Sequence, residues 1–173
     1  MVYKKFVDEK AIAALKNLIG TDVQTIYSDG LAVYNEFIES QLFALKISDG
    51  LWLNFSNKAM ETPSDNDYYE FIITESNSPQ NLKLDNINNS IIYPFSKICL
   101  DNPRITSIEI YSRLETYNGE ELHYDVVLLF HCENGFIFMI SIEERVDEFL
   151  IYSSKPQIIN KYIEGMVLRK SLI

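Results

Sequence analysis

The sequence predicts an α+β fold in which two tandem antiparallel β-meander repeats form one sheet or sandwich about a pseudo-twofold axis. Three observations indicate this fold. Similar segments recur in the same order along the chain, Asn-Gly turns separate apolar β segments, and helical spacing of apolar residues is found near each end. The clearest recurrence is EFIITESNSPQ at 70–80, which returns in part as EFLIYSSKPQ at 148–157.

Four further pairs of segments support a duplication. IYS occurs at 26–28 and 110–112, and LFALKISDGLWLNFS at 42–56 has the pattern of VLLFHCENGFIFMIS at 127–141. The pairs Tyr34-Asn35 and Pro79-Gln80 return as Tyr117-Asn118 and Pro156-Gln157. We therefore expect one domain over 1–173, with repeat one at about 20–84 and repeat two at about 104–160.

The second repeat predicts four strands, because apolar alternation is interrupted by Asn118-Gly119 and by Asn134-Gly135, residue pairs typical of hairpin turns. In the first repeat, the polar stretch 55–69 predicts a longer connection. The segment 93–103 between the repeats is interpreted as a short helical turn.

Two helices are expected outside the meanders. The N-terminal helix, 8–19, has Ile12, Leu15 and Ile19 on one stripe and Gly20 as its C-terminal stop. A C-terminal helix begins after Ser154 as N-cap, with Pro156 in its first turn, and ends near Gly165.

Composition narrows the classes of partner. The chain has 173 residues, 47% hydrophobic and 23% charged, which is typical of a folded domain. Its net charge of −10 repels nucleic acid and anionic membranes, so a basic protein is the expected partner. Apolar runs are shorter than the roughly 20 residues of a membrane span, and the N-terminus lacks a signal-peptide pattern. The two cysteines lack metal-ligand spacing, which predicts buried reduced thiols and a cytoplasmic protein without metal or cofactor.

The predicted partner-binding site is the acidic loop ETPSDNDYYE at 61–70, with these candidate residues: Glu61, Asp65, Asp67, Tyr68, Tyr69 and Glu70. An exposed tyrosine among carboxylates would anchor a cationic partner, while the charges steer its approach. The alternative is that both tyrosines cover a sheet edge. The loop lacks the glycine and the spaced glutamate of a calcium-binding loop, so no metal is expected.

A second candidate set is Glu121, His123 and Asp125, which alternate along a predicted strand and so share a face suited to acid–base work. The competing interpretation is a solvated strand face. The sequence contains no Gly-rich phosphate loop and no nucleophile elbow, and the neighbours His131 and Cys132 point to opposite faces of a strand. We therefore expect a protein that is not an enzyme.

The segment RITSIEIYS followed by DVVLLFHCENGFIFMIS resembles small acidic immunity proteins of bacterial polymorphic or contact-dependent toxin systems, and the likeness covers about residues 105–153. The resemblance implies a cytoplasmic, non-catalytic protein that binds and blocks a toxin domain, often a basic nuclease. The internal duplication departs from that pattern. The sequence thus predicts a non-enzymatic acidic protein that captures a basic protein partner, in the manner of a toxin-neutralising immunity protein. The alternative is a ligand-binding or hydrolytic domain that uses a cleft between the two β repeats, and the oligomeric state stays open.

Overall fold

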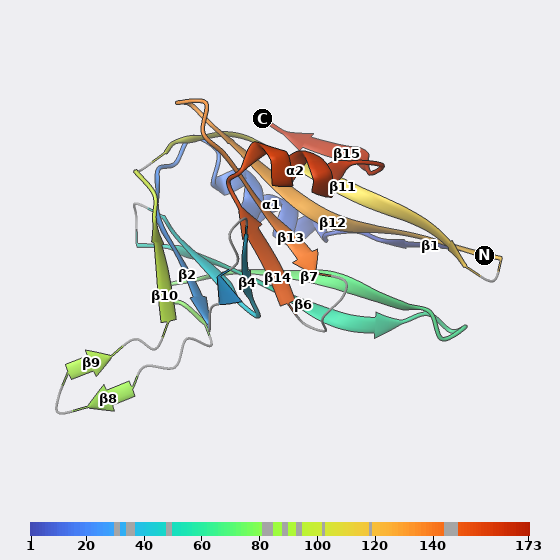
Figure 1. The fold of residues 1–173 in the computed structure, drawn as a ribbon, viewed down its shortest axis with the longest axis horizontal. Coiled ribbons are helices and arrows are strands. Elements are labelled where there is room, and N and C mark those ends of the chain that lie inside the picture. Colours follow the sequence, from blue (N-terminus) through green and yellow to red (C-terminus); the bar gives the residue numbers. More distant parts are fainter. Residues whose placement is uncertain are drawn as a thin grey trace.

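The computed structural model describes residues 1–29, 32–33, 37–47, 50–80, 85–87, 90–92, 95–101, 103–117, 119–143 and 149–173. These residues are mostly β, with two short helices, α1 (Glu9–Asn17) and α2 (Pro156–Ile163) (Figure 1). The strands of the larger sheet are β1 (Val2–Lys5), β3 (Ala32–Val33), β4 (Ile38–Ser40), β11 (Ile105–Tyr117), β12 (Glu120–Cys132), β13 (Ile137–Glu143), β14 (Phe149–Ser153) and β15 (Val167–Leu172). Those of the smaller sheet are β2 (Val23–Asp29), β5 (Phe43–Ile47), β6 (Trp52–Glu61), β7 (Asp67–Ser76) and β10 (Phe95–Cys99). A separate pair is formed by β8 (Asp85–Ile87) and β9 (Ser90–Ile92).

The two sheets are antiparallel along their main paths, and five strands of the larger sheet follow the same order as the five strands of the smaller one. The smaller sheet runs β10-β2-β5-β6-β7, and the larger one runs β15-β11-β12-β13-β14-β4-β3. In the larger sheet, the meander β11-β12-β13-β14 has β15 beside its first strand and β4 and β3 beyond its last. In the smaller sheet, β10 lies beside β2, and the chain between β2 and β5 supplies β3 and β4 to the larger sheet. The short strand β1 pairs in parallel with the part of β12 that β13 does not reach.

The first strands of the two meanders meet through reciprocal backbone hydrogen bonds. The Val23 amide donates to the Pro103 carbonyl at 3.1 Å, and the Ile105 amide donates to the Thr21 carbonyl at 3.0 Å. Both strands then carry a register shift, between Val23 and Thr25 and between Ile105 and Ser107. If the two strands are aligned at these register shifts, Ile26 corresponds to Ile108. The recurring IYS triplets of the sequence instead align Ile26 with Ile110.

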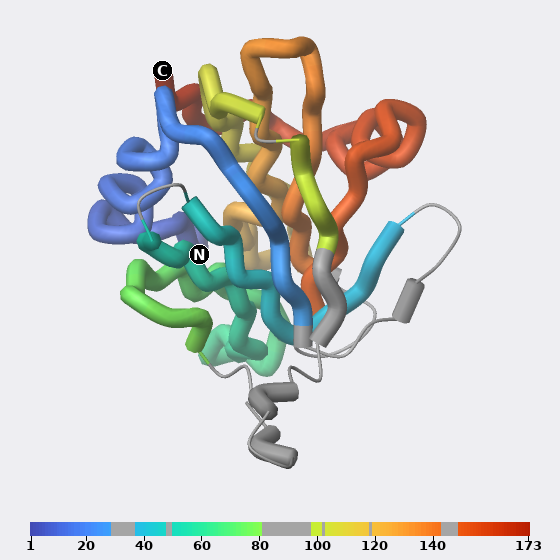
Figure 2. Tube along the Cα trace, turned by 90° about the vertical axis from the view of Figure 1, so that its left-hand side faces the viewer, coloured from blue at the N-terminus to red at the C-terminus, as the bar shows by residue number. Residues whose placement is uncertain are grey.

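Both expected helices are confirmed. The Asp8 carboxylate caps α1 by accepting from the Ala11 amide at 2.7 Å, and Ile12 and Leu15 are buried. Lys155, rather than Ser154, occupies the N-cap position of α2, and Gly165 follows the helix with φ +77°. Figure 2 shows the two helices on opposite sides of the molecule.

Aromatic side chains fill the space between the sheets. Phe55 packs edge-on against Phe130 with ring centroids 6.2 Å apart, and the Asn57 amide donates to the Phe149 carbonyl at 2.9 Å. Residues 124–130 of β12 are all buried. One face of this run packs towards the smaller sheet, and α2 packs on the neighbouring strand β13. Coverage on both faces explains why VVLLF is continuously apolar instead of alternating.

Several local expectations are wrong. Where a helical turn was expected, the described residues 95–99 form strand β10, and most of the polar stretch 55–69 is strand. Cys132 is buried as expected, but Cys99 is exposed. The Asn134-Gly135 turn is confirmed by the positive φ of Gly135, +78°, whereas Tyr34, Asn35 and Asn118 lie outside the described residues. Neither helix of the described chain is long and apolar enough to cross a membrane.

Candidate functional site

Within the predicted 61–70 loop, only residues 62–66 form a turn, which joins β6 to β7 in a hairpin. The Thr62 amide donates to the Asn66 carbonyl at 2.9 Å, and Asp65 adopts φ +58°, a left-handed conformation that aspartate tolerates better than most residues. The Thr62 hydroxyl also accepts from the Asn66 amide at 3.2 Å. Glu61 therefore ends β6, and Asp67 through Glu70 begin β7.

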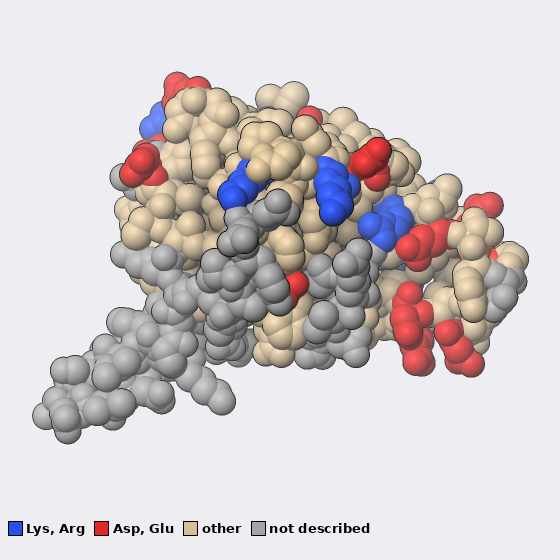
Figure 3. Space-filling model, viewed as in Figure 1, with Lys and Arg blue, Asp and Glu red and all other residues tan. Residues whose placement is uncertain are grey.

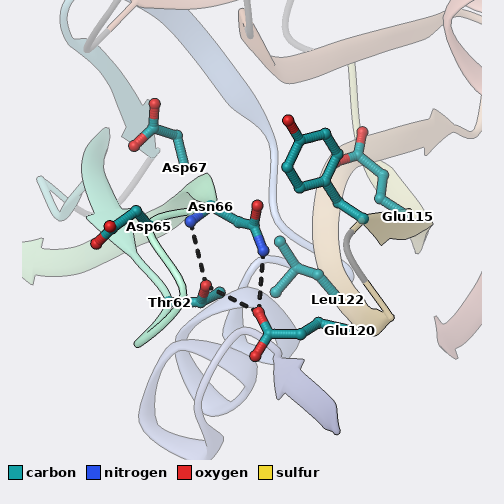
Figure 4. Close-up of a pocket in the computed structure, with 8 residues that line it drawn as sticks. Thr62, Asp65, Asn66, Asp67, Glu115, Glu120 and Leu122 are labelled. Atoms are coloured by element: carbon teal, nitrogen blue, oxygen red, sulfur yellow. Dashed lines mark hydrogen bonds between the residues drawn. The ribbon is translucent and has the colours of Figure 1, made fainter.

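The carboxylate of Glu120, at the start of β12, joins this turn to the larger sheet. It accepts four hydrogen bonds from two other parts of the chain, and the donors are Tyr3 Oη at 3.2 Å, Thr62 Oγ1 at 3.2 Å, Ser64 Oγ at 2.7 Å and Asn66 Nδ2 at 2.9 Å. Figure 4 shows the bonds from Thr62 and Asn66. These hydrogen bonds lower the pKa of Glu120 below its ordinary value, and the bond from Ser64 has the largest effect. Desolvation acts in the opposite direction. The carboxylate is thus held in its charged form.

A cleft of about 290 Å³ lies between the β6–β7 turn and the β11–β12 hairpin. We call this region the acidic tip, and it comprises Thr62, Asp65, Asn66, Asp67, Glu115, Tyr117, Glu120 and Leu122. Asp65 and Asp67 come from the smaller sheet, and Glu115 and Glu120 come from the larger one. Figure 3 shows acidic side chains gathered at the end of the molecule where these hairpins lie.

Tyr117 is the exposed aromatic of the acidic tip, with 63% of its surface accessible. Glu115 is partly compensated, because Arg113 Nη1 lies 3.7 Å from its Oε1. The arrangement can receive a cationic group between carboxylates, with an aromatic ring beside it.

Tyr68 and Tyr69 do not provide the exposed ring that the sequence predicted. They are 2% and 9% exposed, and Tyr68 packs against Tyr124 of β12 with centroids 6.3 Å apart. The Tyr68 hydroxyl donates to Glu70 Oε1 at 3.2 Å, and Lys5 Nζ lies 3.7 Å from the same oxygen. The expectation of a tyrosine anchor at these positions is therefore wrong, because β12 covers the start of β7.

The alternative set of Glu121, His123 and Asp125 is not assembled for acid–base work among the described contacts. The Asp125 carboxylate is 2% exposed and accepts four hydrogen bonds, from Ser112 Oγ at 2.7 Å, the Val7 amide at 2.8 Å, and Arg169 Nε and Nη2, both at 2.6 Å. The His123 ring packs edge-on against Phe6, and Glu121 is exposed. Asp125 thus acts as a buried structural ion-pair partner.

Two β-bulges bring Arg169 and Asp125 together. Val126 is the extra residue of β12 opposite Tyr111 and Ser112 of β11, and Arg169 is the extra residue of β15 opposite Ile110 and Tyr111. Bulges redirect side chains and increase local twist. Ser112 lies on β11, the strand between β12 and β15, is fully buried, and donates its hydroxyl hydrogen to the same carboxylate.

Within the described ranges, no group of three or more His, Cys, Asp or Glu side chains could hold a metal ion. The chain matches no protein-family model, no curated protein and no solved structure. What the acidic tip can bind therefore follows from its own geometry and charge.

Proposed function

We propose that this protein is a non-enzymatic binding protein whose acidic tip captures a basic protein partner, in the manner of a toxin-neutralising immunity protein. The observation that carries the proposal is the cleft between two hairpins, which has carboxylates on both walls and the exposed ring of Tyr117 beside it. The net charge of −10 supports it further, since a field of that sign accelerates the approach of a cationic protein.

An arginine or lysine of the partner fits this cleft best. Asp65 and Asp67 are exposed, so they can pair with a cation that Glu120 attracts from the other wall. A cation over the ring of Tyr117 gains roughly 0.5–2 kcal/mol, depending on how far it is desolvated. Tyrosines of this kind are frequent among the residues that dominate binding.

We also propose that the two meanders descend from a duplicated β unit related by a pseudo-twofold axis. Their common strand order, the reciprocal bonds at Val23 and Ile105, and the register shifts at corresponding places support this origin. The proposal places the protein in the cytoplasm, where an exposed thiol such as Cys99 remains reduced.

The test is binding to the protein encoded by the directly neighbouring reading frame, measured by calorimetry and by protection of cells that express it. The double change Asp65→Lys and Asp67→Lys, combined with Tyr117→Ala, should weaken binding roughly hundredfold, as expected when a dominant contact is lost. The matched control, Glu9→Lys with Glu164→Lys, reverses two exposed charges outside the tip and should bind like the unchanged protein.

The thermal midpoints of both variants should stay within a few degrees of that of the unchanged protein, because the changed side chains are exposed and Tyr117 lies outside the core, while lysine at the left-handed position of Asp65 costs about 1 kcal/mol. Full affinity in the tip variant, or equal loss in the control, would remove the acidic tip from the proposal. Affinity should also fall with salt, because exposed charges are screened over about 10 Å at 0.1 M.

The alternative function, a ligand-binding or hydrolytic domain, is favoured by one observation: the cleft lies between hairpins of the two sheets. Its carboxylates would select a small cation such as a polyamine. Hydrolysis would require groups other than Asp125, whose oxygens are occupied by four donors. Tight binding of spermidine without any protein partner would favour this alternative.

A further inference from the structure

Every acceptor position of the Glu120 carboxylate is occupied by a group of this chain. Its Oε1 accepts from the hydroxyls of Tyr3 and Ser64, and its Oε2 accepts from the Thr62 hydroxyl and the Asn66 side-chain amide. An ionised carboxylate has about four acceptor sites, so none is left over. A cation of a partner can bind Glu120 directly only by displacing one of these donors.

The two aspartates of the acidic tip are available for contact with a partner. Asp65 and Asp67 are exposed, and Figure 4 shows their carboxylates directed away from Glu120. They belong to the β6–β7 turn and to the start of β7, whereas Tyr117 belongs to β11 on the other wall of the cleft. The distance between the aspartates and the tyrosine therefore depends on where the turn is held.

The β6–β7 turn is attached to the larger sheet through Glu120. Among the described hydrogen bonds and ion pairs, those that join residues 62–66 to the larger sheet all end on its carboxylate. The Thr62 hydroxyl connects these bonds with those inside the turn, because it accepts from the Asn66 amide at 3.2 Å and donates to Glu120 at 3.2 Å. Loss of the carboxylate therefore releases the turn and loosens its internal hydrogen bonds.

We propose that Glu120 is a positioning residue of the acidic tip. Its carboxylate holds the β6–β7 turn at a fixed distance from the β11–β12 hairpin, so that Asp65, Asp67 and Tyr117 meet a cationic partner together. Glu120 itself stays bonded to the turn and acts on the partner through these three side chains. This role rests on the function proposed for the tip. Pre-organisation of this kind strengthens binding, because less of the interface has to be ordered when the partner arrives.

Two substitutions at Glu120 separate position from charge. Glu120→Gln removes the charge but can keep the bonds, because an amide offers both an acceptor and donors, and the hydroxyls of Tyr3 and Ser64 can accept as well as donate. Glu120→Ala removes the charge and the bonds together. The matched control is Glu121→Ala, since Glu121 is an exposed carboxylate next to Glu120 and is not among the residues that line the cleft.

The first measurement is amide hydrogen exchange on the full chain, and it needs no partner. In Glu120→Ala, the amides of Thr62, Asp65 and Asn66 should exchange roughly tenfold faster than in the unchanged protein, because the turn opens more easily. Glu120→Gln should restore their exchange to within about threefold, and Glu121→Ala should not change it. Exchange in β13 should stay the same in every variant, which separates release of the turn from a general loss of stability. Unchanged exchange of the turn in Glu120→Ala would overturn the inference.

The second measurement is binding of the protein encoded by the directly neighbouring reading frame. Glu120→Ala should bind it roughly tenfold more weakly than Glu120→Gln, although both variants lack the same charge. Equal losses in these two variants would show that the charge of Glu120 acts on the partner directly, and would also overturn the inference. If the neighbouring protein does not bind even the unchanged chain, the proposed function fails, whereas hydrogen exchange still decides whether Glu120 positions the turn.

Discussion

Replacing Asp125 with alanine should be among the most destabilising single substitutions in this chain. The carboxylate is 2% exposed and binds groups from three other segments, which are the Val7 amide before α1, the Ser112 hydroxyl on β11 and the Arg169 guanidinium on β15. Its removal leaves a guanidinium that is only 18% exposed without its counterion, and the hydroxyl and the amide without their acceptor.

The expected loss follows from these contacts. Breaking a buried ion pair on one side costs about 3–5 kcal/mol, against a total stability of about 5–15 kcal/mol for a domain. The partial exposure of Arg169 places the loss near the lower figure, since the freed guanidinium regains some water. For a chain of this length the thermal midpoint should fall by roughly 6–12 °C, at about 2–4 °C per kcal/mol.

Urea denaturation monitored by circular dichroism measures this loss, with Glu121→Ala as the control. Glu121 is an exposed carboxylate on the same strand, and its removal should change stability by less than about 0.5 kcal/mol. The double variant Asp125→Leu with Arg169→Met should be more stable than Asp125→Ala, because no buried charge remains unpaired. A loss below about 1 kcal/mol for Asp125→Ala, or a double variant as unstable as the sum of the single changes, would refute the reasoning.

Two further predictions concern titratable groups. Because the folded pKa of Glu120 lies below its ordinary value of 4.5, its carboxylate stabilises the fold above that pH, and the contribution disappears as the pH falls through the lowered value. Thermal midpoints between pH 7 and pH 3 should therefore decline less steeply in Glu120→Gln than in the unchanged protein, and parallel declines would contradict the hydrogen-bond cluster. Burial raises the pKa of the Cys132 thiol to about 11, whereas Cys99 is exposed, so an aromatic disulfide reagent at neutral pH should modify one thiol rapidly. The second thiol should react only after unfolding, and two fast thiols in the native protein would show that Cys132 is not enclosed.

Local chemistry allowed part of the fold to be predicted from the sequence. Helix α1 was predictable because its apolar stripe, its Asp8 cap and the glycine after it all lie within a dozen residues. The Asn134-Gly135 turn was predictable for the same reason, since its positive φ depends on the residue itself. Strands β1 and β15 were missed because short, lysine-containing segments lack a clear apolar alternation.

Only the wall of the cleft formed by the β6–β7 turn could be predicted from the sequence. Asp65 and Asp67 were expected because they are neighbours in the sequence, but Glu115, Tyr117 and Glu120 reach the cleft from another sheet. Strand alternation predicts that Tyr68 and Tyr69 point to opposite sides of the strand. It cannot predict that both sides are covered, which depends on the position of distant strands such as β12.

For a related reason, the sequence does not predict that Asp125 is the buried partner of an ion pair. Its alternation with Glu121 and His123 predicts a shared strand face, yet the bulge at Val126 and the arginine 44 residues later determine what the carboxylate contacts. Neither feature has a sequence signal next to Asp125.

The separation of Asp125 and Arg169 along the chain also affects biosynthesis. Translation proceeds from the N-terminus, so the aspartate leaves the ribosome before its counterion has been made. At about 5–20 residues per second, the separation of 44 residues corresponds to a delay of roughly 2–9 s. During that interval the nascent carboxylate stays hydrated, and the larger sheet can close around it only after Arg169 emerges. The smaller sheet, whose last strand ends at Cys99, can form earlier.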